Sequence, residues 1–370
     1  MGLLACDGFS HYQTPDILNK WTTYDVPAAT FSIEPAGGRN GGCLKRVSTS
    51  NSTNNGITMA PTSKQGGPWT PTASGVTGFA LKIDDLTKLL GGTPGTPGGG
   101  LLVNTLMTFY SGTQATFGIA LNPDGSFSLY NFGSGTTLAI SSGVLRNATW
   151  AYVEVKWTVD KVAGVCIIHV NGVEIMNYSG VLFCDTYPNA PPPVAWTSIK
   201  YLGCTSTTTS PLLTMRMDSF YLLDQVAPNA SFLGDINIKV LLTDADGPTV
   251  AWTPTGGANF ANVNDNPPNG DTSYNAATAL GTVDLYSFQP VGVTPIAAQQ
   301  CIYVRRTVPG SAGIQSVFRA GSTNYNSPAQ AVPNDTYSFL RFPYDTSPAT
   351  GIAFTAAEID SGWFGLNKSS

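Results

Sequence analysis

The chain has 370 residues, and only 11% of them are charged, less than half of the roughly 25% found in average proteins. With a net charge of −5 it lacks the clustered Lys and Arg that phosphate backbones require, so we expect no nucleic-acid partner. No apolar run approaches the roughly 20 residues of a spanning helix, and the opening apolar stretch is too short for a signal-peptide core, so we expect no membrane insertion.

The first predicted element is a short helix. Apolar residues at helical spacing in Pro15–Trp21 indicate one or two turns that pack Trp21 on a sheet. Residues 48–75 are dominated by Ser, Thr, Asn, Gly and Pro and predict a long surface excursion. Leu81–Leu90 predicts a strand followed by a helical turn, and the Gly- and Pro-rich residues 91–100 predict an exposed loop.

Strands and tight turns dominate the next 120 residues. The stretch 150–159 alternates, so we expect one face in the core and one in water. The core face carries Val153, Val155, Trp157 and Val159, and the wet face carries Tyr152, Glu154, Lys156 and Thr158. The other predicted strands of this part are Leu101–Ser111, Ala115–Leu121, Ser126–Tyr130, Gly164–Val170, Val173–Ile175, Thr197–Gly203 and Leu213–Leu223.

These elements predict an all-β protein. Antiparallel strands with Asn-Gly and Asp-Gly turns and no helical runs between them indicate an antiparallel jelly-roll-like β-sandwich over residues 1–230. The polar joint near residue 230 separates it from a second, smaller, mainly β domain over residues 231–370. Strands of this second part are expected at Ile236–Leu242, Val283–Phe288, Ile296–Thr307 and Gly313–Ala320. This part could fold alone or complete the sandwich.

Candidate catalytic residues are few. Glucanases with a sandwich fold carry Glu-x-Asp-x-x-Glu on one strand, and Glu358-Ile359-Asp360 is the nearest string, but it lacks the second Glu, and a surface turn is expected there. His11 and His169 have no nucleophile elbow beside them. The six cysteines form no Cys-x-x-Cys pair, so we expect no zinc site.

Two further kinds of ligand remain open. The loops Asp244–Gly247 and Asn262–Asn266 offer oxygen ligands for calcium, although Asp and Asn also make turns without any metal. Sugars stack on exposed aromatic rings, and four tryptophans stand beside turn residues: Trp69, Trp196, Trp252 and Trp363. The sequence assigns no catalytic, cofactor-binding or metal-ligating residue, and no cofactor is expected.

Scattered motifs carry a family resemblance. They are Asp7-Gly8-Phe9-Ser10-His11-Tyr12, Lys20-Trp21, Gly38-Arg39-Asn40-Gly41-Gly42, Trp150–Glu154, Val170-Asn171-Gly172, Phe232-Leu233-Gly234-Asp235, Asp246-Gly247, Trp252-Thr253-Pro254, Asn259, Asn269–Thr272, Tyr274 and Phe364-Gly365. The chain resembles bacteriophage virion or tail-associated proteins with a concanavalin A-like lectin/glucanase (laminin-G-like) domain and a phage-specific C-terminal extension. It departs from them at Val263–Pro267, which has one carboxylate fewer.

The resemblance implies a location in the virion and contacts with other virion proteins. Together with the absence of a catalytic constellation, it leads us to expect no enzyme but a structural component, associated with the tail or decorating the capsid, and a homo-oligomer. The alternative is a tail-fibre lectin for host attachment through surface glycans. A polysaccharide depolymerase would need the paired carboxylates that the sequence does not show.

Overall fold

The computed structural model describes residues 2–24, 30–48, 56–60, 72–89, 105–182, 195–204, 212–333 and 335–370. Within these ranges strands predominate and helices are short, so the predicted all-β class is confirmed. No helix of the described residues is long and apolar enough to cross a membrane. The predicted loop 91–100 lies outside the described residues, as does most of the predicted excursion 48–75.

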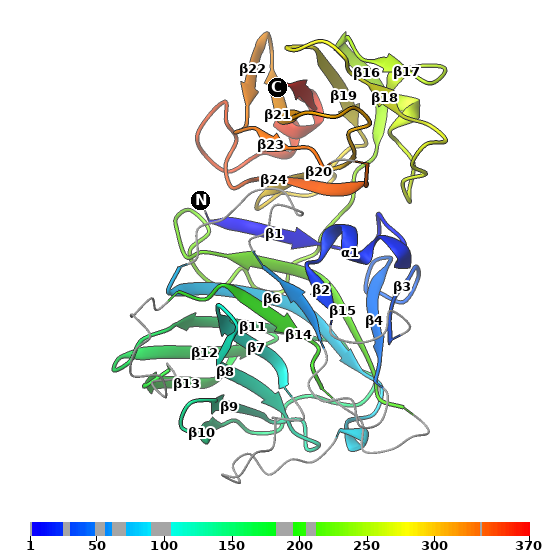
Figure 1. Ribbon diagram of the computed structural model, residues 1–370. Coiled ribbons are helices and arrows are strands. Elements are labelled where there is room, and N and C mark those ends of the chain that lie inside the picture. The colour runs from blue at the N-terminus through cyan, green and yellow to red at the C-terminus, as the bar shows by residue number, and fades with distance from the viewer. Residues whose placement is uncertain are drawn as a thin grey trace.

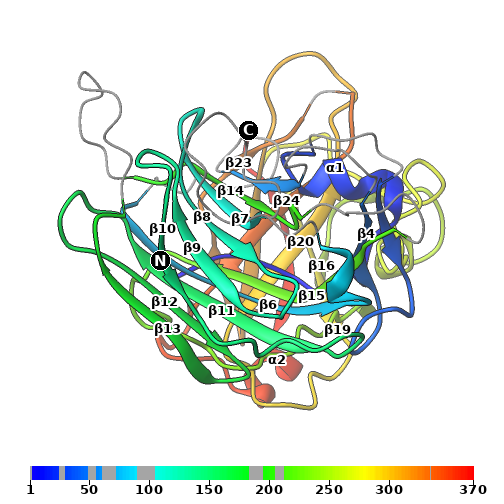
Figure 2. The ribbon, with the colours of Figure 1, turned by 90° about the horizontal axis from the view of Figure 1, so that it is seen from below.

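The first part is a sandwich of two antiparallel sheets, which Figure 2 shows lying face to face. The eight-stranded sheet has the order β13-β12-β11-β6-β15-β4-β3, with β1 also paired to β15. Its strands are β1 (Leu3–Asp7), β3 (Phe31–Glu34), β4 (Cys43–Val47), β6 (Ser74–Ile83), β11 (Ala151–Thr158), β12 (Gly164–Val170), β13 (Val173–Gly180) and β15 (Thr214–Leu223).

The seven-stranded sheet has the order β10-β9-β8-β7-β14-β5-β2. Its strands are β2 (Thr23–Tyr24), β5 (Ile57–Met59), β7 (Thr105–Ser111), β8 (Gln114–Leu121), β9 (Phe127–Asn131), β10 (Thr136–Ile140) and β14 (Ser198–Tyr201). Strand β5 falls inside the predicted excursion, where the polar composition hid the two buried residues Ile57 and Met59.

Alternation along the strands fills the space between the sheets. Val153, Val155 and Trp157 of β11 are buried there, as predicted, and the ring of Trp157 contacts Phe109 of the opposite sheet at a centroid distance of 4.8 Å. The predicted helix is present as a 3-10 turn, η1 (Thr14–Asp16), and α1 (Ile17–Lys20). This helical segment brings Trp21 into the same core, where the ring of Trp21 stacks on Phe9.

A second 3-10 turn, η3 (Leu86–Lys88), follows β6 as predicted.

The second part lies above the sandwich in Figure 1 and is built on a six-stranded sheet of order β16-β19-β25-β21-β22, with β23 paired to β21. Its elements are β16 (Thr243–Val250), β17 (Thr253–Pro254), η4 (Asn259–Asn262), β18 (Asn275–Ala276), β19 (Val283–Phe288), β20 (Ala298–Val304), β21 (Gly313–Ala320), β22 (Thr323–Asn326), β23 (Gln330–Ala331), β24 (Ser338–Tyr344), α2 (Ala356–Ser361) and β25 (Trp363–Lys368). The predicted strand Ile236–Leu242 is wrong, because these residues pair with no other strand.

Strand β24 joins the two parts by serving both of their cores. Leu340 and Phe342 pack in the core of the second part, whereas Phe339 belongs to the core of the sandwich. Arg341 lies between Leu340 and Phe342 and so shares the face of Phe339. Its side chain is buried, and its guanidinium is 3.5 Å from the sulfur of Met59 on β5. Opposite faces of one strand therefore contact two hydrophobic cores.

A buried ion pair lies beside this strand. The ammonium of Lys20 is 3.1 Å from Asp7 Oδ1, and both side chains are inaccessible to water. The other carboxylate oxygen accepts hydrogen bonds from Tyr12 (2.9 Å) and Trp21 (3.2 Å). Burial alone would raise the pKa of Asp7, but the charge of Lys20, followed by His11 and the hydrogen bonds, lowers it below its usual value. The carboxylate therefore stabilises the fold above its unfolded pKa of about 4, and this contribution is lost as the pH falls through the folded pKa.

We expect Asp7→Ala to lower the free energy of unfolding by about 3–5 kcal/mol, because it leaves the ammonium of Lys20 buried without its partner. Urea unfolding followed by tryptophan fluorescence measures the change. The double variant Asp7→Leu/Lys20→Met, which removes both charges, should recover part of the loss. A loss below about 1 kcal/mol in Asp7→Ala would contradict the role given to this pair.

Candidate functional site

The outer face of the eight-stranded sheet is covered at one end by the chain itself. Tyr152 and Glu154, predicted to lie in water, are each only 1% exposed. Residues 232–237, called the strap below, lie over them. Glu154 Oε1 accepts hydrogen bonds from the backbone N–H of Gly234 (2.9 Å) and from the hydroxyl of Tyr221 (2.5 Å). The alternation of β11 was predicted correctly, but its second face is buried by residues 80 positions away in the sequence.

Both ends of the strap are fixed by side chains of the sandwich. The ring of Phe232 stacks on His169 of β12, with centroids 3.9 Å apart. At the other end Arg39 donates to Asp235 (3.0 Å), while its guanidinium lies over the ring of Tyr152. The strap thus closes this part of the face to any ligand.

Beyond the strap, the same face opens into a hollow of about 620 Å³. Three of its side chains come from adjacent strands of the sheet: Lys82 from β6, Arg216 from β15, and Trp150 from the residue just before β11. Its lining is Glu34, Pro35, Ala36, Gly37, Gly38, Lys82, Trp150 and Arg216. We call it the Trp150 hollow.

The turn after β3 forms one wall of the hollow, and it needs glycine. A Cβ on Gly37 would collide with the carboxylate of Glu34, and one on Gly38 would collide with the carbonyl of Gly42 and approach Asp218 to 2.9 Å. The bare backbone of these two residues therefore lets both acidic side chains lie against the turn.

Arg216 holds the charged groups of the hollow in place. Its Nε donates to Glu34 (2.5 Å) and its Nη1 donates to Asp84 (2.6 Å). Lys45 of β4 adds a second contact to Glu34, at 3.2 Å. The hydrogen bond from Arg216 is the largest of the influences that lower the pKa of Glu34, and the same bond raises the pKa of Arg216. Glu34 is therefore held in its charged form.

Asp218 lies behind the wall in a different environment. It follows Arg216 by two residues on β15, is nearly inaccessible to water, and accepts hydrogen bonds from the backbone N–H groups of Arg39 (2.8 Å) and Ser219 (2.6 Å). Burial raises its pKa in spite of these bonds. The pKa values of Glu34 and Asp218 are thus shifted in opposite directions.

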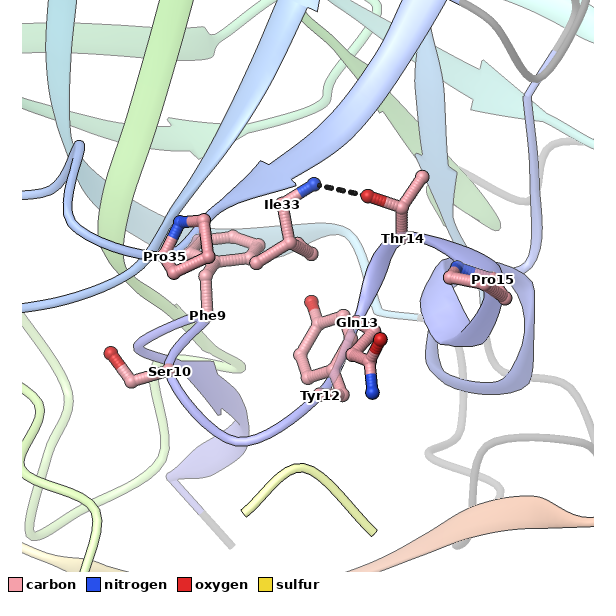
Figure 3. Close-up of a pocket in the computed structure, with 8 residues that line it drawn as sticks. All are labelled: Phe9, Ser10, Tyr12, Gln13, Thr14, Pro15, Ile33 and Pro35. Atoms are coloured by element: carbon pink, nitrogen blue, oxygen red, sulfur yellow. Dashed lines mark hydrogen bonds between the residues drawn. The ribbon is translucent and has the colours of Figure 1, made fainter. Parts of the chain in front are cut away.

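A smaller hollow of about 190 Å³ lies next to the first and shares Pro35 with it. Figure 3 shows its wall, in which the hydroxyl of Thr14 accepts a hydrogen bond from the backbone N–H of Ile33 (2.9 Å). Its other lining residues are Phe9, Ser10, Tyr12, Gln13 and Pro15. None of these side chains carries a charge at neutral pH. The Trp150 hollow therefore offers a ligand more charged and polar contacts than the smaller hollow does.

The carboxylates singled out in the sequence have structural roles. Glu358 and Asp360 lie in the short helix α2, where a surface turn was expected. Glu358 accepts a hydrogen bond from Ser347, and Asp360 accepts one from the backbone N–H of Val291 (2.8 Å). Neither lies on a strand beside a second acid, as a glucanase site would require.

The two segments considered as calcium loops differ from that expectation, because Asp244–Gly247 lies within strand β16 and Asn262 ends η4, and their polar groups are bonded within the protein. Asp246 accepts from the backbone N–H of Phe260 (2.7 Å), Asp244 accepts from Ser287 (2.5 Å), and Asn262 donates to the carbonyl of Gly256 (2.7 Å). No group of three or more His, Cys, Asp and Glu suited to a metal occurs among the described residues.

Of the four tryptophans considered for sugar stacking, Trp69 lies outside the described residues, and the other three line neither of these two hollows. Trp196 and Trp252 are buried, and their indole N–H groups donate to the carbonyls of Ser74 (3.3 Å) and Thr282 (3.0 Å). Trp363 begins β25 in the second part. The sequence analysis missed Trp150, although it has the same parity as Tyr152 and Glu154 and so belongs to the outer face.

Comparison with known proteins finds similarity among solved structures. No family model and no curated protein matches the chain. Among solved structures it is similar to the alginate lyase Aly36B (12% identity, 59% of this chain and 95% of that chain, TM-score 0.39). It is also similar to an endo-1,3-β-glucanase from Streptomyces sioyaensis (9%, 60% and 95%, TM-score 0.35) and to the galectin LEC-6 from Caenorhabditis elegans (7%, 48% and 94%, TM-score 0.27). The antiparallel β-sandwich that was predicted is shown by the pairing of the strands themselves.

The same comparison contradicts two expectations. The chain was expected to be a non-enzymatic structural component of a phage particle, but the similar structures are carbohydrate-active enzymes and a galectin. Its resemblance to phage proteins, its location in the virion, its partners there and its oligomeric state stay predictions. The activities named for these structures are not assigned to this chain, whose function rests on its own residues.

We expect Glu154→Ala to loosen the strap, because the hydroxyl of Tyr221 and the N–H of Gly234 then lose their shared acceptor. The free energy of unfolding should fall by about 2–3 kcal/mol, and hydrogen exchange measured by mass spectrometry should become faster in residues 232–237. Lys156→Ala is the matched control, because Lys156 lies on the same strand and face with no hydrogen bond or ion pair among the described residues. Equal exchange in both variants would show that Glu154 does not hold the strap.

Proposed function

We propose that this protein binds an oligosaccharide in the Trp150 hollow. The observation that carries the proposal is the combination of a half-buried tryptophan with a fixed array of ionic groups on the open end of a sheet face. Aromatic rings stack on the apolar faces of sugars, and charged side chains form strong hydrogen bonds with hydroxyl groups.

The dimensions of the hollow agree with this ligand. Its volume of about 620 Å³ lies within the range of roughly 300–1,000 Å³ that is usual for small-ligand sites. The turn of Gly37 and Gly38 forms one wall of the hollow, and the sheet residues Lys82 and Arg216 line it as well, so a sugar would enter from the solvent side. A chain of sugar units could continue past Pro35 toward the smaller hollow, because both hollows include that residue.

The ionic groups are organised before any ligand arrives. Arg216 bridges Glu34 and Asp84, so the positions of both carboxylates are set by protein contacts. A ligand that finds its partners already fixed loses less free energy to the ordering of side chains. This arrangement favours recognition of a sugar over a purely structural role for the charges, because exposed ion pairs contribute only about 0–1 kcal/mol to stability.

We expect Trp150→Ala to weaken oligosaccharide binding at least tenfold, because loss of the stacking surface removes about 1.5 kcal/mol or more. Affinity is measured by isothermal titration with the best ligand from a glycan array. Trp150→Phe should retain part of the affinity. Tyr274→Ala, which removes an exposed ring from the second part, should leave binding unchanged. Unaltered affinity in Trp150→Ala would place the sugar elsewhere.

Cleavage of the bound saccharide is a second candidate function, favoured by the carboxylates Glu34 and Asp218. Glycosidases need one ionised carboxylate and one protonated carboxyl, and such roles are set by environments that move two pKa values apart. Here Arg216 lowers the pKa of Glu34, whereas burial raises that of Asp218. Glu34 lines the hollow and is the candidate base or nucleophile; Asp218 is the candidate proton donor, and to reach a substrate it would have to be uncovered by a movement of the Gly37–Gly38 turn.

If cleavage occurs, Asp218→Asn and Glu34→Gln should each lower kcat at least 100-fold with little change in KM. Release of reducing ends from the array ligand measures the rate. Wild-type activity should decline as the pH rises through the pKa of Asp218, and again as it falls through the lowered pKa of Glu34. Full activity of both variants would exclude these residues as the acid and base, while leaving the binding proposal intact.

A further inference from the structure

The strand register places three cationic side chains in one row across the eight-stranded sheet. Arg216 of β15 lies opposite Lys82 of β6 on one side and opposite Lys45 of β4 on the other. Neighbouring strands are about 4.7–4.9 Å apart, and like charges placed directly opposite each other are destabilising. A row of three cations therefore needs compensating anions.

Two carboxylates compensate two of the three cations. Glu34 contacts Arg216 and Lys45, and Asp84 contacts Arg216. Lys82 has no ion pair and no hydrogen bond with any of the described residues. The row therefore carries three positive and two negative charges, and the excess positive charge is at Lys82.

Lys82 is also the cation beside the tryptophan. Ala151 pairs with Leu81, so Trp150, one residue earlier on the antiparallel neighbour, lies across from Lys82. Both side chains line the hollow. An ammonium next to a stacking surface suits a sugar ring that carries an acidic group, because the ring and its charge can be bound together.

We propose that the saccharide bound in the Trp150 hollow is acidic, with a carboxylate or sulfate group paired to Lys82. This inference rests on the proposed function and specifies its ligand class. The whole chain has a net charge of −5 and repels anions in general. The uncompensated cation therefore provides selective local attraction in a protein whose overall charge opposes it.

The test uses the full-length protein and pairs of glycans that differ only in charge. The panel contains oligogalacturonate, oligomannuronate, oligoguluronate and a heparin oligosaccharide, together with their carboxyl-reduced or desulfated forms and neutral β-glucan oligomers. At least one acidic member should bind roughly tenfold more tightly than its neutral counterpart. Its affinity should fall as the salt concentration rises.

Substitutions then assign the charge preference to Lys82. Lys82→Gln should reduce the roughly tenfold difference in affinity between the acidic and neutral members of the pair to less than about twofold. Lys156→Gln is the matched control, because Lys156 lies on the same face without a partner among the described residues and should leave the preference unchanged.

The outcomes separate the two proposals. Binding of neutral glycans alone, or a preference for acidic glycans that survives Lys82→Gln, would overturn the inference while the proposed function stands. Failure of every member of the panel to bind would overturn the proposed function itself. A lost preference in Lys82→Gln with an intact one in Lys156→Gln supports both.

Discussion

The buried carboxylate of Asp7 is the contact on which the joint between the two parts depends. It holds Lys20, Tyr12 and Trp21 together, and these residues form the surface that receives Phe339 of β24. β24 contributes side chains to both cores, and β20 beside it also bonds to the sandwich, through Gln299 to the carbonyl of Cys6 (3.0 Å) and through Tyr303 to Asp16 (3.2 Å). The strap begins in the chain segment between the two parts, so its path over the sheet depends on this joint as well.

The strap, in turn, covers one end of the outer face of the eight-stranded sheet, so only the other end is open to a ligand. Its backbone N–H groups donate hydrogen bonds to Glu154 and to the hydroxyl of Tyr221, and it covers Tyr152. That end of the face therefore contains a separate, buried hydrophobic cluster. Motifs far apart in the sequence meet here, since Arg39 and Asn40 of the first part bond to Asp235 and Asn237 of the second. These contacts give both motifs a shared structural role, which is to hold the strap on the sheet.

Sequence patterns predicted the strands well because each pattern reports a local property. The predicted bounds of β12, β19 and β21 agree with those in the structure, and the parity of β11 was correct. The patterns failed where a distant contact decides the outcome. Glu154 was expected in water, because alternation tells which residues share a face and cannot tell what covers it.

The site was hidden for the same reason. Glu34, Lys82 and Arg216 lie on three separate strands, and only the register of the sheet makes them neighbours of Trp150. Ile236–Leu242, in contrast, has the composition of a strand but pairs with none: Ile236 packs on the outer face of the sandwich, and Leu241 packs against the core of the second part.

The distribution of charge gives the strongest reason to treat the Trp150 hollow as functional. Charged residues make up 11% of the chain, yet they supply three of the eight residues that line the hollow, and Asp84 and Lys45 pair with them. A sheet face needs no such cluster for stability, because aromatic and β-branched pairs serve that purpose without desolvating ions. Five ionisable groups gathered beside one half-buried aromatic ring therefore form the part of this face best suited to the proposed ligand, and the glycines of the neighbouring turn let Glu34 and Asp218 lie against its backbone.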